Sequence, residues 1–358
     1  MKGRHQAPAT GRIKTGVGRF LAVLCSVVLF LVIGLYCVML VLTHGPSENA
    51  TRIFVLSANE TSAMKFLPSL CMSKTEIEGI LSGVGQTEIE APPVDPSLTE
   101  LGYAPGVEPP KVQQETEKPP ETQPELEVLD IKGSTYKGKL MIVKDPSRVI
   151  VGTLDHYGTG YGLYLTEFIE KYNAVGGTNA GGFEDINGNG TGAIPDGLVI
   201  KDGKLAWGQP GVFYNDVIGF DAEHKLHVGN MTGQAALDLG IVSAVSFAPG
   251  PVLIKDGVVQ TNLGGGMNPR TCIGQRPDGT VLLAVIEGRH PSSFGATYDD
   301  LAKLMSDYGA VNAANLDGGS SSTMFYEGEQ ITRGSNIVGS RQMATAILIL
   351  PEKEGGAS

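Results

Sequence analysis

The sequence predicts an α+β fold, with a single sheet-rich domain and a few packed helices behind one transmembrane helix and a disordered stalk. Three observations support this. A charge-free run follows a basic N-terminus, a Pro- and Glu-rich stretch interrupts the chain, and the remainder contains many short apolar runs bounded by Gly, Pro or Asp. Because these strand signals outnumber helix signals and do not alternate with them, an α+β domain is favoured over a doubly wound sheet.

The N-terminus has the features of an uncleaved membrane anchor. Residues 1–19 contain Lys and Arg but no acidic residue, and residues 20–42 carry no charge. At about 1.5 Å per residue this run spans a hydrocarbon core of about 30 Å, and it is long for the apolar part of a signal peptide. The positive-inside rule predicts a single-pass cell-membrane protein, with residues 1–19 as a cytoplasmic tail and the rest extracytoplasmic.

Three parts follow the anchor. Residues 43–90 form a mixed membrane-proximal segment, with one short helix expected after Ser73, which Glu76 would help to cap. Residues 91–127 are rich in Pro, Glu, Gln, Thr and Lys and predict an extended, disordered linker that separates the next part from the membrane. Residues 128–352 are long enough for one compact domain.

Within this domain, apolar runs predict strands at residues 140–143, 149–152, 198–200, 212–220, 244–247, 252–254, 281–286 and 344–350. Two similar turns, Lys201-Asp202-Gly203 and Lys255-Asp256-Gly257, predict tight hairpins. Helical spacing predicts a helix over 298–308, capped by Thr297 or Asp299, and a second over 163–172.

Charge and cysteine content exclude some classes of protein. The net charge of −11 argues against a nucleic-acid partner, which would require a basic surface. Cys25 and Cys37 lie in the predicted span, which leaves Cys71 and Cys272, so there is no disulfide framework. A bridge between these two is not expected because the linker separates them.

Four glycine-containing loops at the ends of apolar runs carry the candidate site residues. Each loop combines an open backbone with a polar or charged side chain, as binding sites often do. Taken alone, a carboxylate in such a loop is more often an ordinary surface group. The loops contribute Asn179, Gly181 and Gly182; Arg270; Glu287 and Arg289; and Asp317, Gly318, Gly319 and Ser320.

Five motifs in this order resemble the phosphodiester glycosidase family, which includes the mannose 6-phosphate uncovering enzyme and bacterial relatives. The motifs are Asn-x-Gly-Gly-Phe, Gly-Pro-x-Leu, Asn-Pro-Arg-Thr, Glu-Gly-Arg and Asn-Leu-Asp-Gly-Gly-Ser-Ser, within residues 136–350. The resemblance implies hydrolysis that removes a sugar, such as N-acetylglucosamine, from a phosphodiester, here in an envelope or extracellular glycan.

Roles can be assigned to the residues on chemical grounds. A phosphate monoester is a good leaving group, with a second pKa of about 6, so little general acid catalysis is needed. We expect Asp317 and Glu287 to serve as the catalytic carboxylates and Arg270 and Arg289 to hold the phosphate. The remaining loop residues and Arg341 are expected to bind substrate, and no cofactor is required.

A calcium site is a further possibility in the sequence. Asp185, Asn187, Asn189 and Asp196 follow the ligand spacing of a calcium loop, although the flanks are not those of an EF-hand. A Gly- and Asn-rich turn explains the same residues. Two other functions therefore remain open: a metal-dependent phosphodiesterase that uses this loop, and a non-catalytic module that binds a sugar-phosphate polymer.

Overall fold

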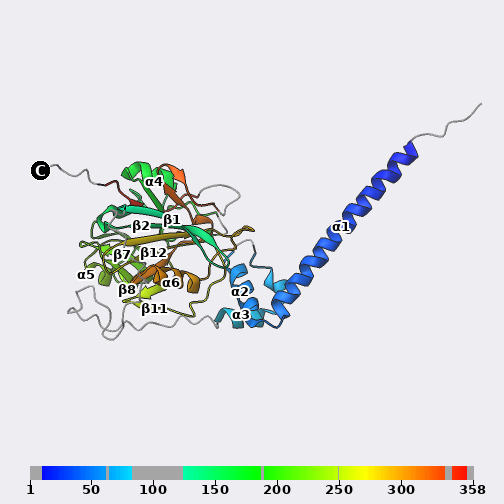
Figure 1. Cartoon of the computed structure of the whole chain (residues 1–358), viewed down its shortest axis with the longest axis horizontal. Coiled ribbons are helices and arrows are strands. Elements are labelled where there is room, and N and C mark those ends of the chain that lie inside the picture. The colour runs from blue at the N-terminus through cyan, green and yellow to red at the C-terminus, as the bar shows by residue number, and fades with distance from the viewer. Residues whose placement is uncertain are drawn as a thin grey trace, which may run out of the picture.

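The computed structural model describes residues 10–61, 64–82, 124–186, 189–248, 250–334 and 341–352. Most of the predicted linker and residues 1–9 of the predicted tail lie outside these ranges. Figure 1 shows a long N-terminal helix that stands away from a sheet-rich body, with two short helices between them. The α+β prediction is confirmed.

The described residues form six α-helices and three antiparallel sheets. The helices are α1 (Thr10–His44), α2 (Glu48–Asn59), α3 (Lys74–Ser82), α4 (Leu165–Tyr172), α5 (Gly233–Asp238) and α6 (Tyr298–Asp307). The largest sheet has the order β1-β2-β13-β12-β14-β10-β11, and the others have the orders β16-β15-β4-β17-β3 and β6-β5-β9-β7-β8.

The strands lie close to the predicted runs, and further strands appear between them. Their bounds are β1 (Leu126–Lys132), β2 (Lys137–Val143), β3 (Val149–Thr153), β4 (Gly176–Asn179), β5 (Val199–Lys201), β6 (Lys204–Trp207), β7 (Phe213–Asp221), β8 (Leu226–Thr232), β9 (Ile241–Ser246), β10 (Val252–Lys255), β11 (Val258–Val259), β12 (Arg270–Gln275), β13 (Val281–Ile286), β14 (Asn312–Leu316), β15 (Met324–Tyr326), β16 (Glu329–Gln330) and β17 (Thr345–Ile349). Strand β1 begins two residues before the predicted domain boundary at 128.

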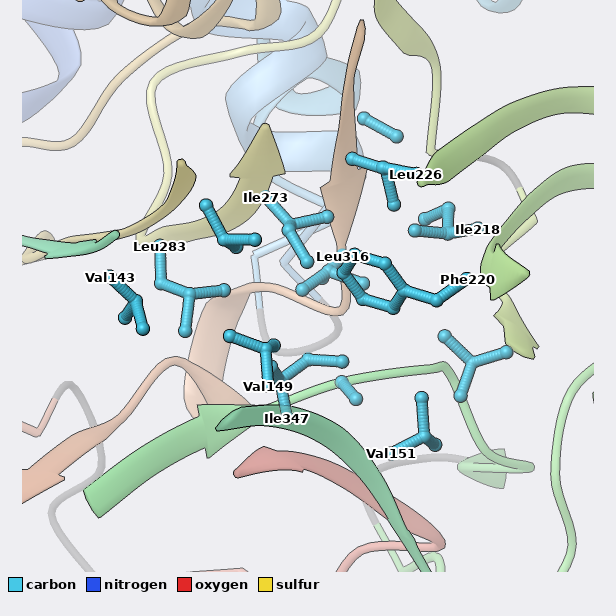
Figure 2. Packing of buried hydrophobic residues seen from close by; sticks show 14 of the residues in the cluster. Val143, Val149, Val151, Ile218, Phe220, Leu226, Ile273, Leu283, Leu316 and Ile347 are labelled. Carbon is cyan, nitrogen blue, oxygen red and sulfur yellow. The ribbon is translucent and has the colours of Figure 1, made fainter. Parts of the chain in front are cut away.

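The three sheets share one apolar core. Leu283 and Ile273 from the seven-stranded sheet, Ile347 from the second sheet and Phe220 from the third belong to one buried cluster, as Figure 2 shows. Helix α6 packs on the outer face of the seven-stranded sheet, and α4 packs on the second sheet. Burial of these faces is the main force that holds the sheets together.

Local sequence chemistry explains the tight connections. Asp202 and Asp256 have φ values of 51° and 49° and each precedes a glycine with positive φ, as a tight hairpin turn requires. Thr297 caps α6 by accepting a hydrogen bond from Asp300 N at 3.2 Å. Both hairpin predictions and this cap prediction are confirmed.

The membrane-proximal segment contains a helix that the sequence did not predict. Helix α1 includes an apolar stretch, Gly18–His44, that is long enough to cross a membrane, and α3 starts after Ser73 as expected. Between them lies α2, in which Val55 and Leu56 are buried. Its Ser57 Oγ accepts a hydrogen bond from Met267 N of the sheet-rich domain. Residues 43–90 are therefore partly docked on the domain.

Candidate active site

Strand register brings three of the predicted loops to one edge of the seven-stranded sheet. Arg270, the first residue of β12, pairs with Ile286 at the end of β13, and Thr271 pairs with Leu316 at the end of β14. The residues that follow these two strand ends are Glu287 and Asp317. Antiparallel pairing therefore places the Arg270, Glu287 and Asp317 loops side by side.

Asn179 connects the end of β4 to this edge. Its Nδ2 donates to Asp317 O at 2.6 Å, and its Oδ1 accepts from Thr271 Oγ1 at 2.8 Å and from Thr323 N at 3.2 Å. Only 1% of the residue is exposed. Asn179 therefore positions the Asp317 loop, and both the nitrogen and the oxygen of its amide are hydrogen-bonded within the protein.

Gly181 and Gly182 serve close packing. Their N–H groups donate to Thr345 Oγ1 and to Ser246 O. A Cβ at Gly182 would lie 2.7 Å from the Phe247 ring, so a larger residue would push the neighbouring loop away. The structure gives these glycines a supporting role behind the loop, where the sequence suggested direct binding.

Asp317 is half-buried directly after the end of β14, and its surroundings disfavour the charged form of its carboxyl group. Oδ1 accepts from Gly318 N at 2.8 Å. Desolvation raises the pKa of Asp317 to about 6, against the opposing effects of Ser321, the Gly318 N–H and Arg341. A carboxylate with this pKa is ionised at neutral pH, yet poorly solvated, as suits a group that must react.

Arg341 forms the second part of the site. Its Nη1 donates to Asp185 Oδ2 at 2.7 Å and to Ser320 Oγ at 3.1 Å, and its Cζ lies 4.9 Å from the centre of the Phe183 ring. Its Nη2 is buried and has no hydrogen-bond partner among the described residues. One arm of the guanidinium is therefore fixed, and the other is left without a hydrogen-bond partner among the described residues.

Other buried polar atoms near this loop also lack partners within the described part of the chain. They are Asn315 Oδ1, Ser322 Oγ and Thr323 Oγ1. Buried polar atoms are normally hydrogen-bonded, so these atoms have room for a partner that the described residues do not supply, such as water or a polar ligand.

Arg270 and Arg289 also lie against the Asp317 loop, next to Gly318 and Gly319. Arg270 is 4% exposed, stacks on Tyr298 with its Cζ 3.9 Å from the ring centre, and donates to Ala296 O. A Cβ at Gly319 would lie 3.2 Å from Arg289 Nη2. Desolvation and then the charge of Arg270 lower the pKa of Arg289, which shows that the two guanidinium groups are close.

Glu287 is on the same edge, but its carboxylate makes other contacts. Oε1 accepts from Arg333 N at 2.7 Å, and Oε2 lies 3.3 Å from His290 Nε2. No hydrogen bond joins it to Asp317, Arg270 or Arg289 among the described residues. The Glu287 carboxylate is therefore directed to Arg333 and His290, and Asp317 is the carboxylate that lies with the Arg341 group.

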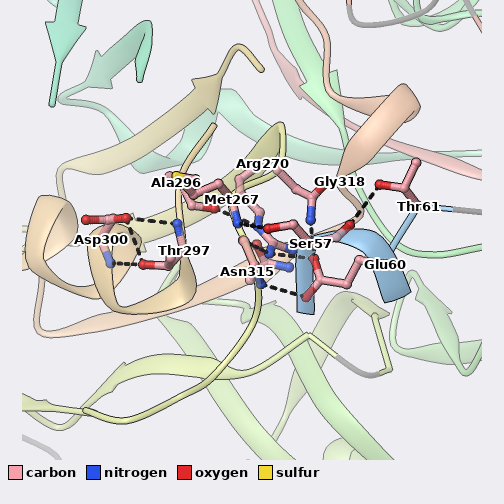
Figure 3. A network of polar contacts seen from close by, with 12 residues as sticks. Ser57, Glu60, Thr61, Met267, Arg270, Ala296, Thr297, Asp300, Asn315 and Gly318 are labelled. Carbon is pink, nitrogen blue, oxygen red and sulfur yellow. Dashed lines mark hydrogen bonds and ion pairs between the residues drawn. The ribbon is translucent and has the colours of Figure 1, made fainter. Parts of the chain in front are cut away.

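Glu60 is a site residue that the sequence did not reveal. It follows α2, and its Oε2 accepts from Arg270 Nη2 at 2.7 Å. The two residues are 210 positions apart, and no local motif links them. Figure 3 shows Glu60 and Ser57 from the membrane-proximal segment against the Arg270 loop.

In the predicted calcium loop, the first carboxylate already has other partners. Asp185 accepts from Gly190 N at 2.8 Å with one oxygen and from Arg341 with the other, so a positive charge already stands at the first ligand. Asn187 lies outside the described residues, and the rest hold no group of three or more His, Cys, Asp or Glu placed to bind a metal. Calcium binding therefore stays a prediction.

Asp216 is a second carboxylate that the sequence analysis missed. It sits in an irregular part of β7 with φ 48°, is 5% exposed, and its Oδ1 accepts from Val252 N at 3.1 Å. Desolvation raises the pKa of Asp216 to about 7. It holds the start of β10, next to the Gly250 turn that contacts Asn315.

We expect Asp216→Asn to reduce the pH dependence of stability. The pKa of Asp216 in the folded protein exceeds its ordinary value of 3.8, so the carboxyl group stays protonated in the fold at pH values where it ionises in the unfolded chain. Its contribution to the free energy of unfolding is therefore fully present below about pH 4 and is lost as the pH rises through about 7. The full shift corresponds to a change on the order of 4 kcal/mol in the free energy of unfolding. Urea unfolding at pH 5 and pH 8 measures this. The variant should lose less stability over this interval than the wild type, and an equal loss would contradict the prediction.

With the geometry described, the family can be assigned. The phosphodiester glycosidase family matches residues 172–350, which include all four loops. The chain belongs to this family.

Two relatives illustrate the range of similarity. The SPbeta prophage-derived uncharacterized protein YomE of Bacillus subtilis (strain 168) is 30% identical over 232 residues, which are 62% of this chain and 35% of that protein. This chain thus spans about a third of the length of that relative. The catalytic domain of zebrafish N-acetylglucosamine-1-phosphodiester alpha-N-acetylglucosaminidase, auto-inhibited by its pro-peptide, matches with a TM-score of 0.52 and 22% identity over 65% of this chain and 85% of that chain, so the fold is shared.

Proposed function

We propose that this protein hydrolyses the glycosidic bond of a sugar-1-phosphodiester, such as one of N-acetylglucosamine. Family membership supports a hydrolase of this kind. The observation that carries the proposal is a desolvated carboxylate, Asp317, on a loop whose next residues lie against three arginines: Gly318 against Arg270, Gly319 against Arg289 and Ser320 against Arg341. A positive surround suits an anionic phosphate, and the carboxylate suits an oxocarbenium-like carbon.

In the reaction that we propose, the bond between C1 of the sugar and the phosphate oxygen breaks. The phosphate monoester leaves with the bonding electrons and is held by the free arm of Arg341 and by Arg270 and Arg289. Asp317 stabilises or attacks C1. A water oxygen finally becomes attached to C1, and the proton that this water loses passes to the departed phosphate monoester or to the solvent. Since the leaving group is a weak base, no strong general acid has to be found among the residues.

The substrate is expected in an envelope or extracellular glycan. The apolar helix α1 is compatible with a signal anchor, and the basic residues before it predict a cytoplasmic N-terminus and an extracytoplasmic site. The cytoplasmic N-terminus and the extracytoplasmic location of the site are therefore proposed, as the substrate is.

The proposal is tested by incubating the full-length protein, in detergent, with a panel of sugar-1-phosphodiesters and measuring free reducing sugar. We expect turnover of at least one N-acetylhexosamine phosphodiester. Binding of such compounds without release of sugar from any of them would favour the binding module and contradict the proposal.

A further inference from the structure

The membrane-proximal segment places a carboxylate in a set of hydrogen-bond donors at the site. Glu60 Oε2 accepts from Arg270 Nη2 at 2.7 Å and from Asn268 Nδ2 at 2.5 Å, and Oε1 accepts from Gly266 N at 3.2 Å. A guanidinium, an amide and a backbone N–H are the donors that proteins use to bind carboxylate or phosphate oxygens. Figure 3 shows the Glu60 carboxylate beside Arg270, with dashed contacts reaching its oxygens.

The charges indicate that this set of donors requires an anion. The Arg270 side chain is 5% exposed, and it also donates to the backbone carbonyls of Ala296 and Gly266, which carry no charge. A buried guanidinium is costly unless a counter-ion compensates it. Arg289 adds a second positive charge nearby, and its Nη2 also contacts Thr61 Oγ1 at 3.4 Å. Glu60 supplies the negative charge in the present conformation.

We propose that Arg270, Asn268 and the Gly266 N–H form the subsite for the phosphate of the substrate, and that Glu60 fills this subsite as an internal ligand that the substrate must displace. This inference rests on the proposed function. Because Glu60 belongs to the same chain, it competes at an effective concentration on the order of mM. The apparent affinity for phosphate is therefore the affinity of the open subsite multiplied by the fraction of molecules in which Glu60 has left it.

The docked segment is also connected to the membrane helix. Thr51 Oγ1 donates to Leu42 O of α1 at 2.8 Å, and Arg52 Nη2 donates to Asn262 Oδ1 of the domain at 3.3 Å. Ser57 Oγ accepts from Met267 N at 2.9 Å. Helix α2 thus joins α1 to the subsite, so the test requires the full-length chain.

Two variants open the subsite by different routes. Glu60→Ala removes the carboxylate. Gly266→Ala keeps it, but the added Cβ would overlap the Ser57 backbone and force the segment away. Glu48→Ala, at an exposed position in the first turn of α2, is the matched control.

The readouts are the Kd for inorganic phosphate, measured by calorimetry, and the KM for a sugar-1-phosphodiester, both on full-length protein in detergent. We expect Glu60→Ala and Gly266→Ala each to lower the Kd and the KM by about tenfold, and Glu48→Ala to change neither. Thermal unfolding verifies that each variant is folded.

The possible outcomes separate the two claims. Weaker phosphate binding and a higher KM in Glu60→Ala would show that Glu60 is part of the binding site. Unchanged values in a folded Glu60→Ala variant with normal turnover would show that Glu60 does not compete with phosphate. Either result overturns the inference and leaves the proposed function intact. Tighter phosphate binding without turnover in any variant would support the subsite and overturn the proposed function.

Discussion

Asp317→Asn is expected to lower kcat/KM by at least about 10³-fold without destabilising the protein. The asparagine can still accept from Gly318 N, but it cannot supply the negative charge that the reacting carbon requires. Because desolvation raises the pKa of Asp317 to about 6, its ionised form is disfavoured in the fold, and the neutral asparagine should melt at an equal or higher temperature at pH 8. Initial rates and thermal unfolding measure the two effects.

The pKa of Asp317 also predicts how kcat/KM depends on pH. If Asp317 acts as an anion, kcat/KM of the wild type should fall about tenfold for each pH unit below its pKa of about 6. Asp130→Asn is the matched control and should keep the wild-type pH profile. The Asp130 side chain is 87% exposed on β1, and its ion pair with Lys139 contributes little to stability. Activity that instead declines as pH rises through 6 would assign Asp317 to the role of an acid.

Arg341→Lys is expected to reduce kcat/KM by about 10²-fold. The planar guanidinium holds Asp185 and Ser320 with Nη1 while Nη2 remains available, and a lysine ammonium cannot do both in this geometry. Arg276→Lys is the control. Arg276 follows the opposite end of β12 from Arg270, donates to Tyr308 O, and its replacement should leave kcat/KM within about twofold. Comparable losses in both variants would mean that the effect of Arg341 is structural.

Local features of the fold were predictable because their causes are local. Asp202-Gly203 and Asp256-Gly257 adopt the positive φ values that tight hairpins need, and Thr297 lies next to the donor that it caps. The run at residues 281–286 became β13 with the same bounds, since uninterrupted apolar residues suit a fully buried strand.

The site was only partly predictable because side-chain direction and long-range docking are not local. The sequence identified the Asp317, Arg270 and Glu287 loops, and strand register brings them together. It could not show that Asn179 points inward to Asp317 O, or that the Glu287 carboxylate turns to Arg333 N. The prediction also missed α2, whose contacts with the domain lie about 210 residues away in sequence.

Hydrolysis in ¹⁸O-labelled water tests the central claim most directly. The label should be read in the released phosphate monoester by mass spectrometry, because the anomeric oxygen of a free sugar exchanges with water. Our account predicts cleavage of the C1–O bond, so the phosphate monoester should contain no ¹⁸O. Incorporation of ¹⁸O into the phosphate monoester would show that the P–O bond breaks, and would contradict the assignment of Asp317 and the arginines to a glycosidase site.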